Sequence, residues 1–225
     1  MVDLKNKVVL ITGSSIGIGK ATAFEFAKEG SKVVITYNKD KEEAEQTRLK
    51  CTTLGASDTL LLHLDLTDNQ SIIYTVEKTI QKFGQIDILI NNAGVLAWKP
   101  LREQSFEEIE AQVRVNLEGL IKITKISLPY LTDCIINISS GAGKSPFPEL
   151  TTYCATKYGV RGFTQSLALE EESLRIYSVN PGMTATRMTN YIGVPPEKVA
   201  KVILNTAKGL YNIPSGGDVD VWELV

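Results

Sequence analysis

Short runs of Val, Ile and Leu alternate with segments of helical periodicity along the whole chain. We predict strands at Lys7–Thr12, Lys32–Tyr37, Leu60–Leu66, Ile86–Ile90, Cys134–Ser139 and Arg175–Val179, and a final strand at Val219–Trp222. Strands that are apolar on both faces and separated by helices are typical of a parallel sheet covered on both sides. Right-handed crossovers then predict an α/β fold with a doubly wound parallel sheet in three layers. Its ligand site is expected beyond the carboxyl ends of the strands.

Start and stop signals divide the segments between these runs into helices. The predicted helices cover Lys20–Lys28, Asp40–Thr52, Asp68–Phe83, Ser105–Ile126, Tyr153–Glu171 and Pro196–Gly209. Asp68 is placed to cap the third helix, which ends before Gly84. Ser105 and Glu108 have the spacing of a capping box at the start of the fourth. No repeat, low-complexity tract or flexible linker interrupts the pattern, so we predict one domain over residues 1–225.

The composition argues against several classes of protein. The hydrophobic content is 43%, and the net charge is −2 with acidic and basic residues interleaved. We therefore expect no nucleic-acid groove and no polybasic membrane patch. Cys51, Cys134 and Cys154 cannot all pair, and their spacing fits no metal site, so reduced thiols, no metal and a cytoplasmic location are expected. The N-terminus has no signal-peptide pattern, and no apolar stretch approaches the length of a membrane span.

A glycine-rich segment, TGSSIGIG, joins the first predicted strand to the first predicted helix. Gly13 permits a tight turn, Gly17 lets a diphosphate approach the backbone, and Gly19 allows the helix to pack closely on the strand. The helix N-terminus adds free N–H groups and a positive dipole. This context favours a dinucleotide site over the alternative, a glycine-rich turn that binds nothing.

Four motifs together resemble the short-chain dehydrogenase/reductase family. They are the glycine loop Thr12–Gly19, the sequence NNAG at Asn91–Gly94, the Y-x-x-x-K motif from Tyr153 to Lys157, and Asn180-Pro181-Gly182 followed by Thr186. They occur in the family's order and span nearly the whole chain. The resemblance implies a Rossmann fold, a nicotinamide cofactor, and hydride transfer between the cofactor and a carbonyl or alcohol. The cofactor-binding residues that it implies are Gly13, Ser15, Ile16, Gly17, Ile18, Gly19, Asn38, Lys39, Asp65, Leu66, Asn92, Ala93, Gly94, Tyr153, Lys157, Pro181, Gly182, Thr184 and Thr186.

Tyr153 and Lys157 lie four residues apart on a predicted helix, so both side chains project from one face. A phenol has a pKa near 10 when unperturbed, and a neighbouring ammonium is expected to lower it, so that Tyr153 serves as general acid and base. The resemblance implies that Lys157 also holds the nicotinamide ribose. It further implies that Ser140 donates to the substrate oxygen, with Ser139 as the alternative, and that Asn116 supports a water path to the lysine. Without the other motifs, Asn116 would be read as a surface helix residue.

The residues after the second strand bear on the choice of cofactor. An NAD enzyme commonly places an acid there against the adenosine ribose, but this chain has Asn38 and Lys39, with Asp40 following. Lys39 can pair with a 2′-phosphate, which favours NADP, with NAD as the alternative. Ile16 argues the other way, because many NADP-using relatives carry a basic residue in the glycine loop. Asp65 resembles the family's adenine-contacting acid; alternatively, it caps a helix.

A short substrate lid is expected over residues 183–195. Met188 and Tyr191 of this lid, and Trp98 from elsewhere in the chain, are candidates for lining an apolar pocket. The resemblance implies a homodimer or homotetramer built on the helices of Asn116 and Tyr153, and a small-molecule carbonyl or alcohol as substrate. A 3-oxoacyl-thioester reductase is a variant of this prediction. The alternatives are a catalytically silent redox sensor that binds the dinucleotide, and a sugar epimerase, whose relatives carry a larger C-terminal region.

Overall fold

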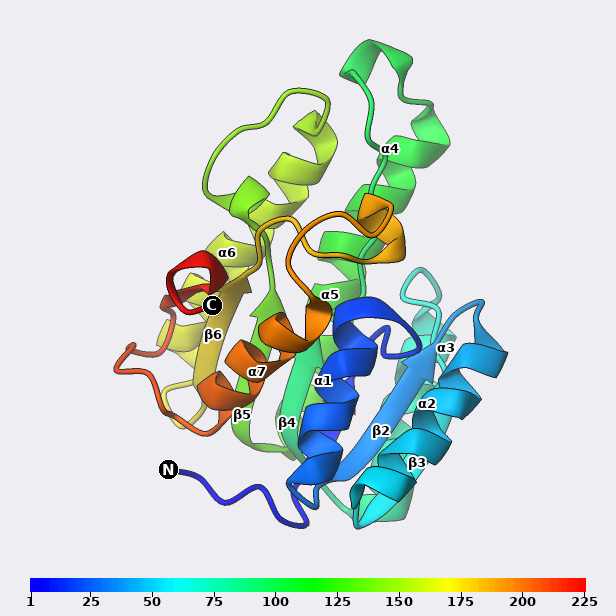
Figure 1. Cartoon of the computed structure of the whole chain (residues 1–225), viewed down its shortest axis with the longest axis vertical. Helices are drawn as coiled ribbons and strands as arrows, with labels where there is room; N and C mark the ends of the chain where they lie inside the picture. The colour runs from blue at the N-terminus through cyan, green and yellow to red at the C-terminus, as the bar shows by residue number, and fades with distance from the viewer.

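Seven strands form one parallel sheet in the computed structural model, which describes residues 1–225 (Figure 1). They are β1 (Val8–Ile11), β2 (Lys32–Tyr37), β3 (Asp58–His63), β4 (Ile86–Asn91), β5 (Leu131–Ile138), β6 (Arg175–Asn180) and β7 (Asp218–Asp220). Their order across the sheet is β3-β2-β1-β4-β5-β6-β7. The chain therefore begins in the middle, runs outward to β3, and returns to build the other half from β4. The crevice between β1 and β4 is the switch point at which open α/β sheets bind ligands.

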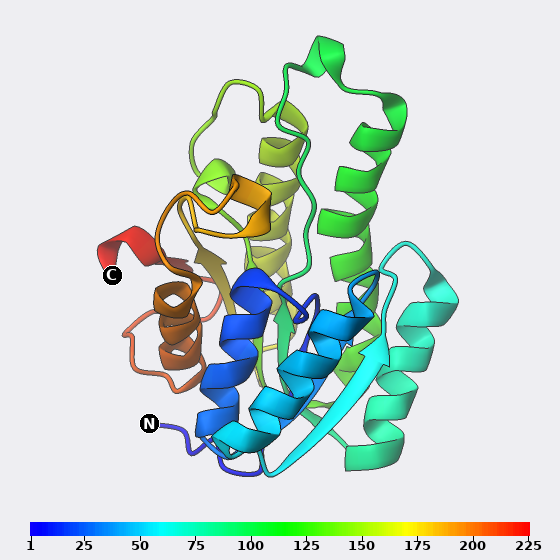
Figure 2. The same ribbon diagram turned by 45° about the vertical axis from the view of Figure 1, so that its right-hand side comes forward.

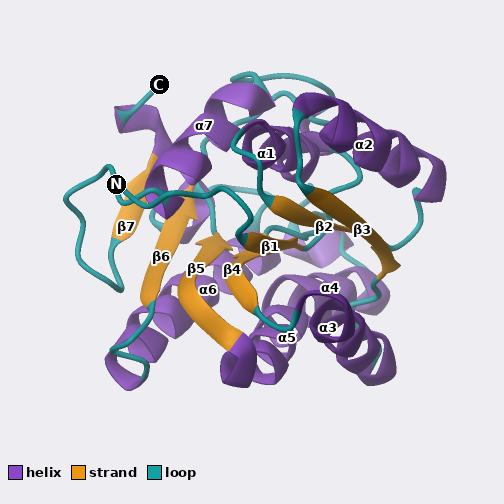
Figure 3. Ribbon diagram, turned by 90° about the horizontal axis from the view of Figure 1, so that it is seen from below, coloured by secondary structure: helices purple, strands orange, loops and turns teal.

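Helices cover both faces of the sheet, as Figure 3 shows. One face carries α1 (Gly17–Lys28), α2 (Lys41–Leu54) and α7 (Pro196–Ala207), and the other carries α3 (Asn69–Phe83), α4 (Phe106–Val113), α5 (Leu120–Ser127) and α6 (Thr151–Glu170). Figure 2 shows α4 and α6 extending together beyond the carboxyl ends of the strands, where the two helices contact each other. The central strands β1 and β4 are buried along their whole length, as their predominantly apolar sequences predict. The predicted three-layer Rossmann fold is thus confirmed.

Two strand boundaries differ from the sequence prediction because of pairing across the sheet, and one helix also begins earlier than predicted. β3 covers Asp58–His63 rather than Leu60–Leu66, since His63 faces Tyr37, the last residue of β2, and β3 has no other neighbour. β5 begins earlier than predicted, at Leu131, because that residue pairs with Ile86. α1 begins at Gly17, inside the glycine loop.

The helix predicted from Ser105 to Ile126 is interrupted. α4 and α5 are separated by a π-helical turn, Arg114–Gly119, that contains Asn116. A π-turn holds one more residue per hydrogen-bonded ring than an α-helix, and such turns are frequent at functional sites. The start signal of this segment is nevertheless correct, because Ser105 and Glu108 form the predicted capping box.

The other predicted cap is also present. The Asp68 carboxylate accepts from the Gln70 N–H at the start of α3, and Gly84 ends that helix in the left-handed region with φ of 82°. None of the helices combines the length and the apolar character that crossing a membrane requires.

Candidate active site

An open cavity of about 710 Å³ lies beyond the carboxyl ends of β1, β2, β4, β5 and β6. Most of the residues predicted to bind cofactor or substrate line it. They are Gly13, Ser15, Ile16, Gly17, Ile18, Asn38, Lys39, Leu66, Asn92, Ala93, Gly94, Ser140, Tyr153, Lys157, Pro181, Gly182, Thr184 and Thr186. Three predicted residues do not line the cavity: Gly19, Asp65 and Asn116. The sheet therefore gathers into one space side chains that lie up to about 170 positions apart in the chain.

The glycine loop turns sharply at the end of β1. Gly13 has φ of 64°, in the left-handed region, and its N–H donates to the Thr36 hydroxyl at 3.0 Å. Gly19 lies beneath the loop, where an added Cβ would come within 2.4 Å of the Gly13 carbonyl oxygen. Gly19 is therefore required by close packing of the helix against the glycine loop itself and Asn92, rather than against a strand as predicted, and it does not face the cavity.

The segment after β4 is tied to the glycine loop through Asn92. Its side-chain amide donates to the carbonyl oxygens of Thr12 at 2.9 Å and Gly13 at 3.0 Å. The Thr12 hydroxyl in turn accepts from the backbone N–H groups of Asn92 and Ala93, at 2.9 and 3.0 Å. These bonds fix the two loops relative to each other at the switch point of the sheet.

Tyr153, Lys157 and Ser140 meet at the inner wall of the cavity. Tyr153 and Lys157 project from α6, and the Lys157 Nζ lies 5.5 Å from the centroid of the Tyr153 ring. Lys157 is 3% exposed and donates to the Ile138 carbonyl oxygen at 2.8 Å. Ser139 and Ser140 both line the cavity, but the buried Ser139 hydroxyl donates to the Lys157 carbonyl at 2.9 Å, so the choice of Ser140 stays the prediction. The Ser140 hydroxyl lines the cavity and accepts from the Ala142 N–H.

Burial dominates the ionisation of both groups on α6. It raises the pKa of Tyr153 to about 12, an effect that a hydrogen bond with Ser140 partly opposes. It also lowers the pKa of Lys157 to about 8. The expectation that Lys157 depresses the phenol pKa is thus wrong for the chain alone, because desolvation raises that pKa and the only group that lowers it is Ser140. At neutral pH Tyr153 holds its proton.

Asn116 is buried, so its reading as a surface helix residue is wrong. Its side-chain oxygen accepts from the Val95 N–H at 2.7 Å, while its amide donates to the Val95 carbonyl at 2.9 Å and to the Thr156 hydroxyl at 3.2 Å. It thereby joins the loop after β4 to α6, one position before Lys157. The role in a water path to the lysine stays a prediction.

The adenosine end of the cavity lies beside β2. Tyr37, Asn38, Lys39 and Asp40 line it, and Lys39 is exposed and forms no ion pair. Asp40 instead pairs with Arg187 of the lid at 3.2 Å. Leu66 reaches the wall as predicted. The Asp65 carboxylate accepts from the N–H and hydroxyl of Thr67, so its direct contact with adenine remains only a prediction.

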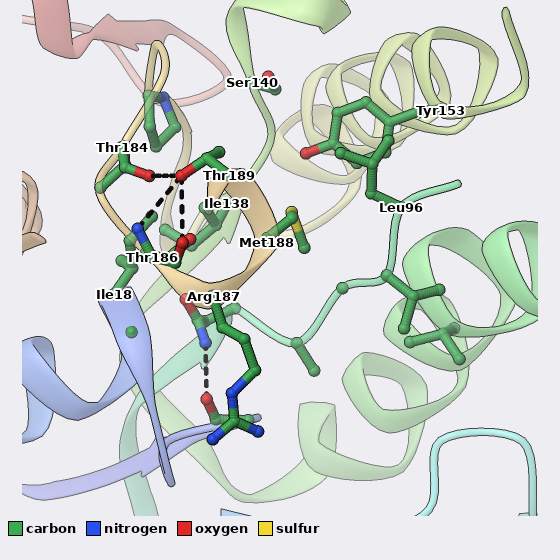
Figure 4. Close-up of a pocket in the computed structure, with 18 of the residues that line it drawn as sticks. Ile18, Leu96, Ile138, Ser140, Tyr153, Thr184, Thr186, Arg187, Met188 and Thr189 are labelled. Carbon is green, nitrogen blue, oxygen red and sulfur yellow. Dashed lines mark hydrogen bonds between the residues drawn. The ribbon is translucent and has the colours of Figure 1, made fainter. Parts of the chain in front are cut away.

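The lid is a short, internally bonded segment (Figure 4). The Thr189 hydroxyl donates to the Thr184 and Thr186 carbonyl oxygens and accepts from the Thr186 N–H. Figure 4 shows Met188 extending toward Leu96 and Tyr153, and Arg187 extending away from them. Met188 and Trp98 line the cavity as anticipated, whereas Tyr191 does not.

The sequence reading missed one wall of the cavity. Phe147, Pro148, Glu149 and Leu150 line it immediately before α6. Their position in the sequence between Ser140 and Tyr153 could have predicted this, because a segment that connects two residues of one site has to pass close to that site. No motif marks these residues.

The loop residues fit a dinucleotide. Ile16, the residue that precedes α1, has no side chain that can cap the helix, so the N–H groups of its first turn are left for an external acceptor. Gly17 is the first residue of α1, and Gly13 and Gly17 both line the cavity. An anionic diphosphate is the ligand that such a helix N-terminus favours. Asn92 to Gly94 and Pro181 to Thr186 would flank the nicotinamide half next to Tyr153.

Comparison with known proteins agrees with this geometry. Residues 7–195 match the sequence model of a family described as short chain dehydrogenase. The chain is 37% identical over 209 residues to the 3-oxoacyl-[acyl-carrier-protein] reductase FabG of Thermotoga maritima, which covers 90% of this chain and 82% of that protein. An uncharacterized oxidoreductase of Staphylococcus saprophyticus is 35% identical over 196 residues, covering 84% of this chain and 83% of its own.

Solved structures are similar over almost the whole length. A short chain dehydrogenase from Burkholderia cenocepacia in complex with NADP superposes with a TM-score of 0.90 at 26% identity, covering 97% of both chains. A 3-ketoacyl-(acyl-carrier-protein) reductase from Brucella melitensis complexed with NADH gives a TM-score of 0.89 at 28% identity, again over 97% of both.

Proposed function

This chain belongs to the short-chain dehydrogenase family and is an NAD(P)-dependent oxidoreductase, and we propose that it interconverts a carbonyl and an alcohol with Tyr153 as the acid and base. The observation that carries the proposal is the convergence of Tyr153, Lys157 and Ser140 on one wall of the cavity. A module that only binds a dinucleotide needs no placed proton donor, so this arrangement favours an enzyme over a silent sensor.

The bound cofactor supplies the hydride during reduction and accepts it during oxidation. In the reducing direction, the Tyr153 hydroxyl gives its proton to the substrate oxygen as negative charge develops there. Ser140 donates a second hydrogen bond to the same oxygen, which stabilises that charge. The raised pKa of Tyr153 keeps the proton available at neutral pH.

Lys157 acts on this centre from beneath. Its Nζ is held by the Ile138 carbonyl, close enough to Tyr153 to favour the phenolate once the proton has left. Oxidation of an alcohol needs that phenolate as the base, so Lys157 is needed in both directions. We assign it a second role in holding the nicotinamide ribose.

We also propose that NADP is preferred over NAD. Lys39 is a cation without a partner at the adenosine end, and Asp40, the only acid on that wall, is neutralised by Arg187. A 2′-phosphate is attracted by the charge of Lys39 and is not repelled by Asp40, whose charge is paired.

Cytoplasmic location and assembly into a homodimer or homotetramer complete the proposal. The three cysteines are free and buried, in keeping with a reducing compartment. Exposed apolar side chains on α4, α5 and α6, among them Val113, Ile121, Tyr158 and Leu169, support packing against a second copy. Light scattering of the purified protein measures the assembly directly.

The test is Tyr153→Phe, which removes the transferable proton and keeps the ring. Turnover of carbonyl substrates should fall by about 10² or more, the scale of general acid catalysis, while NADPH affinity stays within a few-fold. Tyr74→Phe, an exposed position on α3 outside the cavity, is the matched control and should retain full turnover. If Tyr153→Phe also retains it, the assignment is wrong. Cofactor binding without turnover of any carbonyl would instead support the sensor.

A further inference from the structure

Five charged residues line the cavity, and their distribution is uneven. Lys39, Asp40 and Arg187 lie at the adenosine end, and Lys157 lies in the catalytic centre. Glu149 is the one charged residue at the opposite end, four positions before Tyr153. Substrate binds at that end, because the cofactor would fill the side next to β2. The charge that a substrate meets away from its carbonyl is therefore negative.

The Glu149 carboxylate is not neutralised by the protein. It forms no ion pair, and its one side-chain bond is from the Trp98 indole N–H at 3.1 Å. The ammonium of Lys99, a residue whose backbone bonds to Glu149, is engaged elsewhere, since it pairs with Glu108 at 2.6 Å. The exposed carboxylate keeps its remaining lone pairs for an outside partner.

The backbone holds this carboxylate in place. Glu149 has φ of 65°, a conformation that costs a residue with a side chain more than it costs glycine. Its carbonyl oxygen accepts from the Lys99 N–H at 3.1 Å, and the next residue leads into α6. The segment that carries Glu149 is thus fixed between the loop after β4 and the catalytic helix.

Large apolar side chains line the same cavity, and one of them, Trp98, contacts the carboxylate. Trp98, Phe147, Met183 and Met188 line the cavity and remain between 42% and 49% exposed. An aromatic ring beside an unpaired carboxylate, as in Trp98 and Glu149, is the combination that binds an alkylammonium, through cation–π attraction and direct charge pairing. The same carboxylate disfavours a substrate that carries a carboxylate or phosphate there, by like-charge repulsion.

We propose that the substrate is an amino ketone or amino aldehyde, or the corresponding amino alcohol, whose cationic nitrogen binds at Glu149 while its carbonyl lies at Tyr153 and Ser140. This inference rests on the proposed function and names its substrate class. In the reducing direction the carbonyl carbon gains the cofactor's hydride and the oxygen gains the Tyr153 proton. The ammonium takes no part in the chemistry and serves only for binding.

The experiment uses three methyl ketones of equal length that end in a trimethylammonium, a tert-butyl or a carboxylate group. The first two have nearly the same shape and differ in charge, and neither end donates a hydrogen bond. With the purified enzyme and NADPH, we expect kcat/KM to be about tenfold or more higher for the cation than for the neutral ketone, and lowest for the acid. The difference should lie mainly in KM, as expected for binding that is equal in ground and transition states.

Glu149→Gln keeps the shape and removes the charge, so the cation and the neutral ketone should then differ by less than about twofold. Glu149→Gly relieves the backbone strain and should abolish the preference as well, which provides a second variant if the first folds poorly. Glu110→Gln, an exposed acid outside the cavity, is the matched control and should keep the preference. Equal kcat/KM for all three ketones in the wild type would overturn the inference and leave the proposed function standing. Failure to bind NADPH and NADH would overturn both.

Discussion

Replacing Lys157 by methionine should stabilise the chain in the absence of cofactor while ending catalysis. Burial lowers the pKa of Lys157 from 10.5 to about 8. One pKa unit corresponds to about 1.4 kcal/mol, so carrying the charge in the fold costs roughly 3 kcal/mol at pH 7. Methionine has a similar length and removes that cost. The loss of the hydrogen bond to the Ile138 carbonyl destabilises the variant by about 1–2 kcal/mol. The net result is that Lys157→Met is more stable than the wild type by about 1–2 kcal/mol.

The sign of this difference depends on pH. The folded-state pKa is the lower one, so between about pH 8 and 10.5 the unfolded chain binds more protons at this site than the folded chain does. The stability of the wild type therefore rises through that window relative to Lys157→Met. Below about pH 8 the full penalty is present. Above about pH 10.5 it is gone, and the variant should be the less stable one because it still lacks the hydrogen bond.

Urea unfolding of both proteins without cofactor, at pH 7 and at pH 10, measures the effect. The difference between wild type and variant cancels the titration of the groups that do not contact Lys157. The reasoning fails if Lys157→Met is less stable at pH 7, or if the difference between the two free energies of unfolding does not move toward the wild type between the two pH values.

Two further predictions concern the cofactor site. Gly19→Ala places a Cβ within 2.4 Å of the Gly13 carbonyl and should weaken NADPH binding by more than about tenfold in a fluorescence titration. The control is Gly162→Ala on α6, whose added Cβ has no atom within 4 Å. This variant should bind NADPH normally, and its free energy of unfolding should rise by up to about 1 kcal/mol. Lys39→Ala should raise the dissociation constant of NADPH by about tenfold and that of NADH by less than twofold. Lys41→Ala, two positions further on and outside the cavity, should change neither. An equal loss of affinity for the two cofactors would show that Lys39 does not bind the 2′-phosphate.

Much of the fold followed from local signals in the sequence. Buried parallel strands need unbroken apolar runs, and the glycine loop needs residues without a Cβ, so both are written in consecutive positions. The capping box at Ser105 and the cap at Asp68 are local in the same sense. The cavity-lining residues of the four motifs came together because parallel strands present their carboxyl ends at one edge.

What the sequence did not indicate depends on contacts between distant segments. β3 is shorter than its apolar run because its only partner, β2, ends at Tyr37. The pKa of Tyr153 rises because of the surrounding burial, which its spacing from Lys157 does not reveal. Glu149 carries no motif, and its importance emerges only when the cavity wall and the left-handed backbone are known.

The π-helical turn makes this site sensitive to the length of the chain as well as to its side chains. Arg114–Gly119 holds one residue more than a regular helix would, and the two hydrogen bonds between the Asn116 side chain and the Val95 backbone keep it there. Deleting a single residue from the turn would let α4 and α5 join into one regular helix. It would also swing Asn116 away from Val95 and detach the loop after β4 from the catalytic helix. A more regular helix would thus be a poorer scaffold, and a lineage that shortened this turn would have to find another way to anchor that loop.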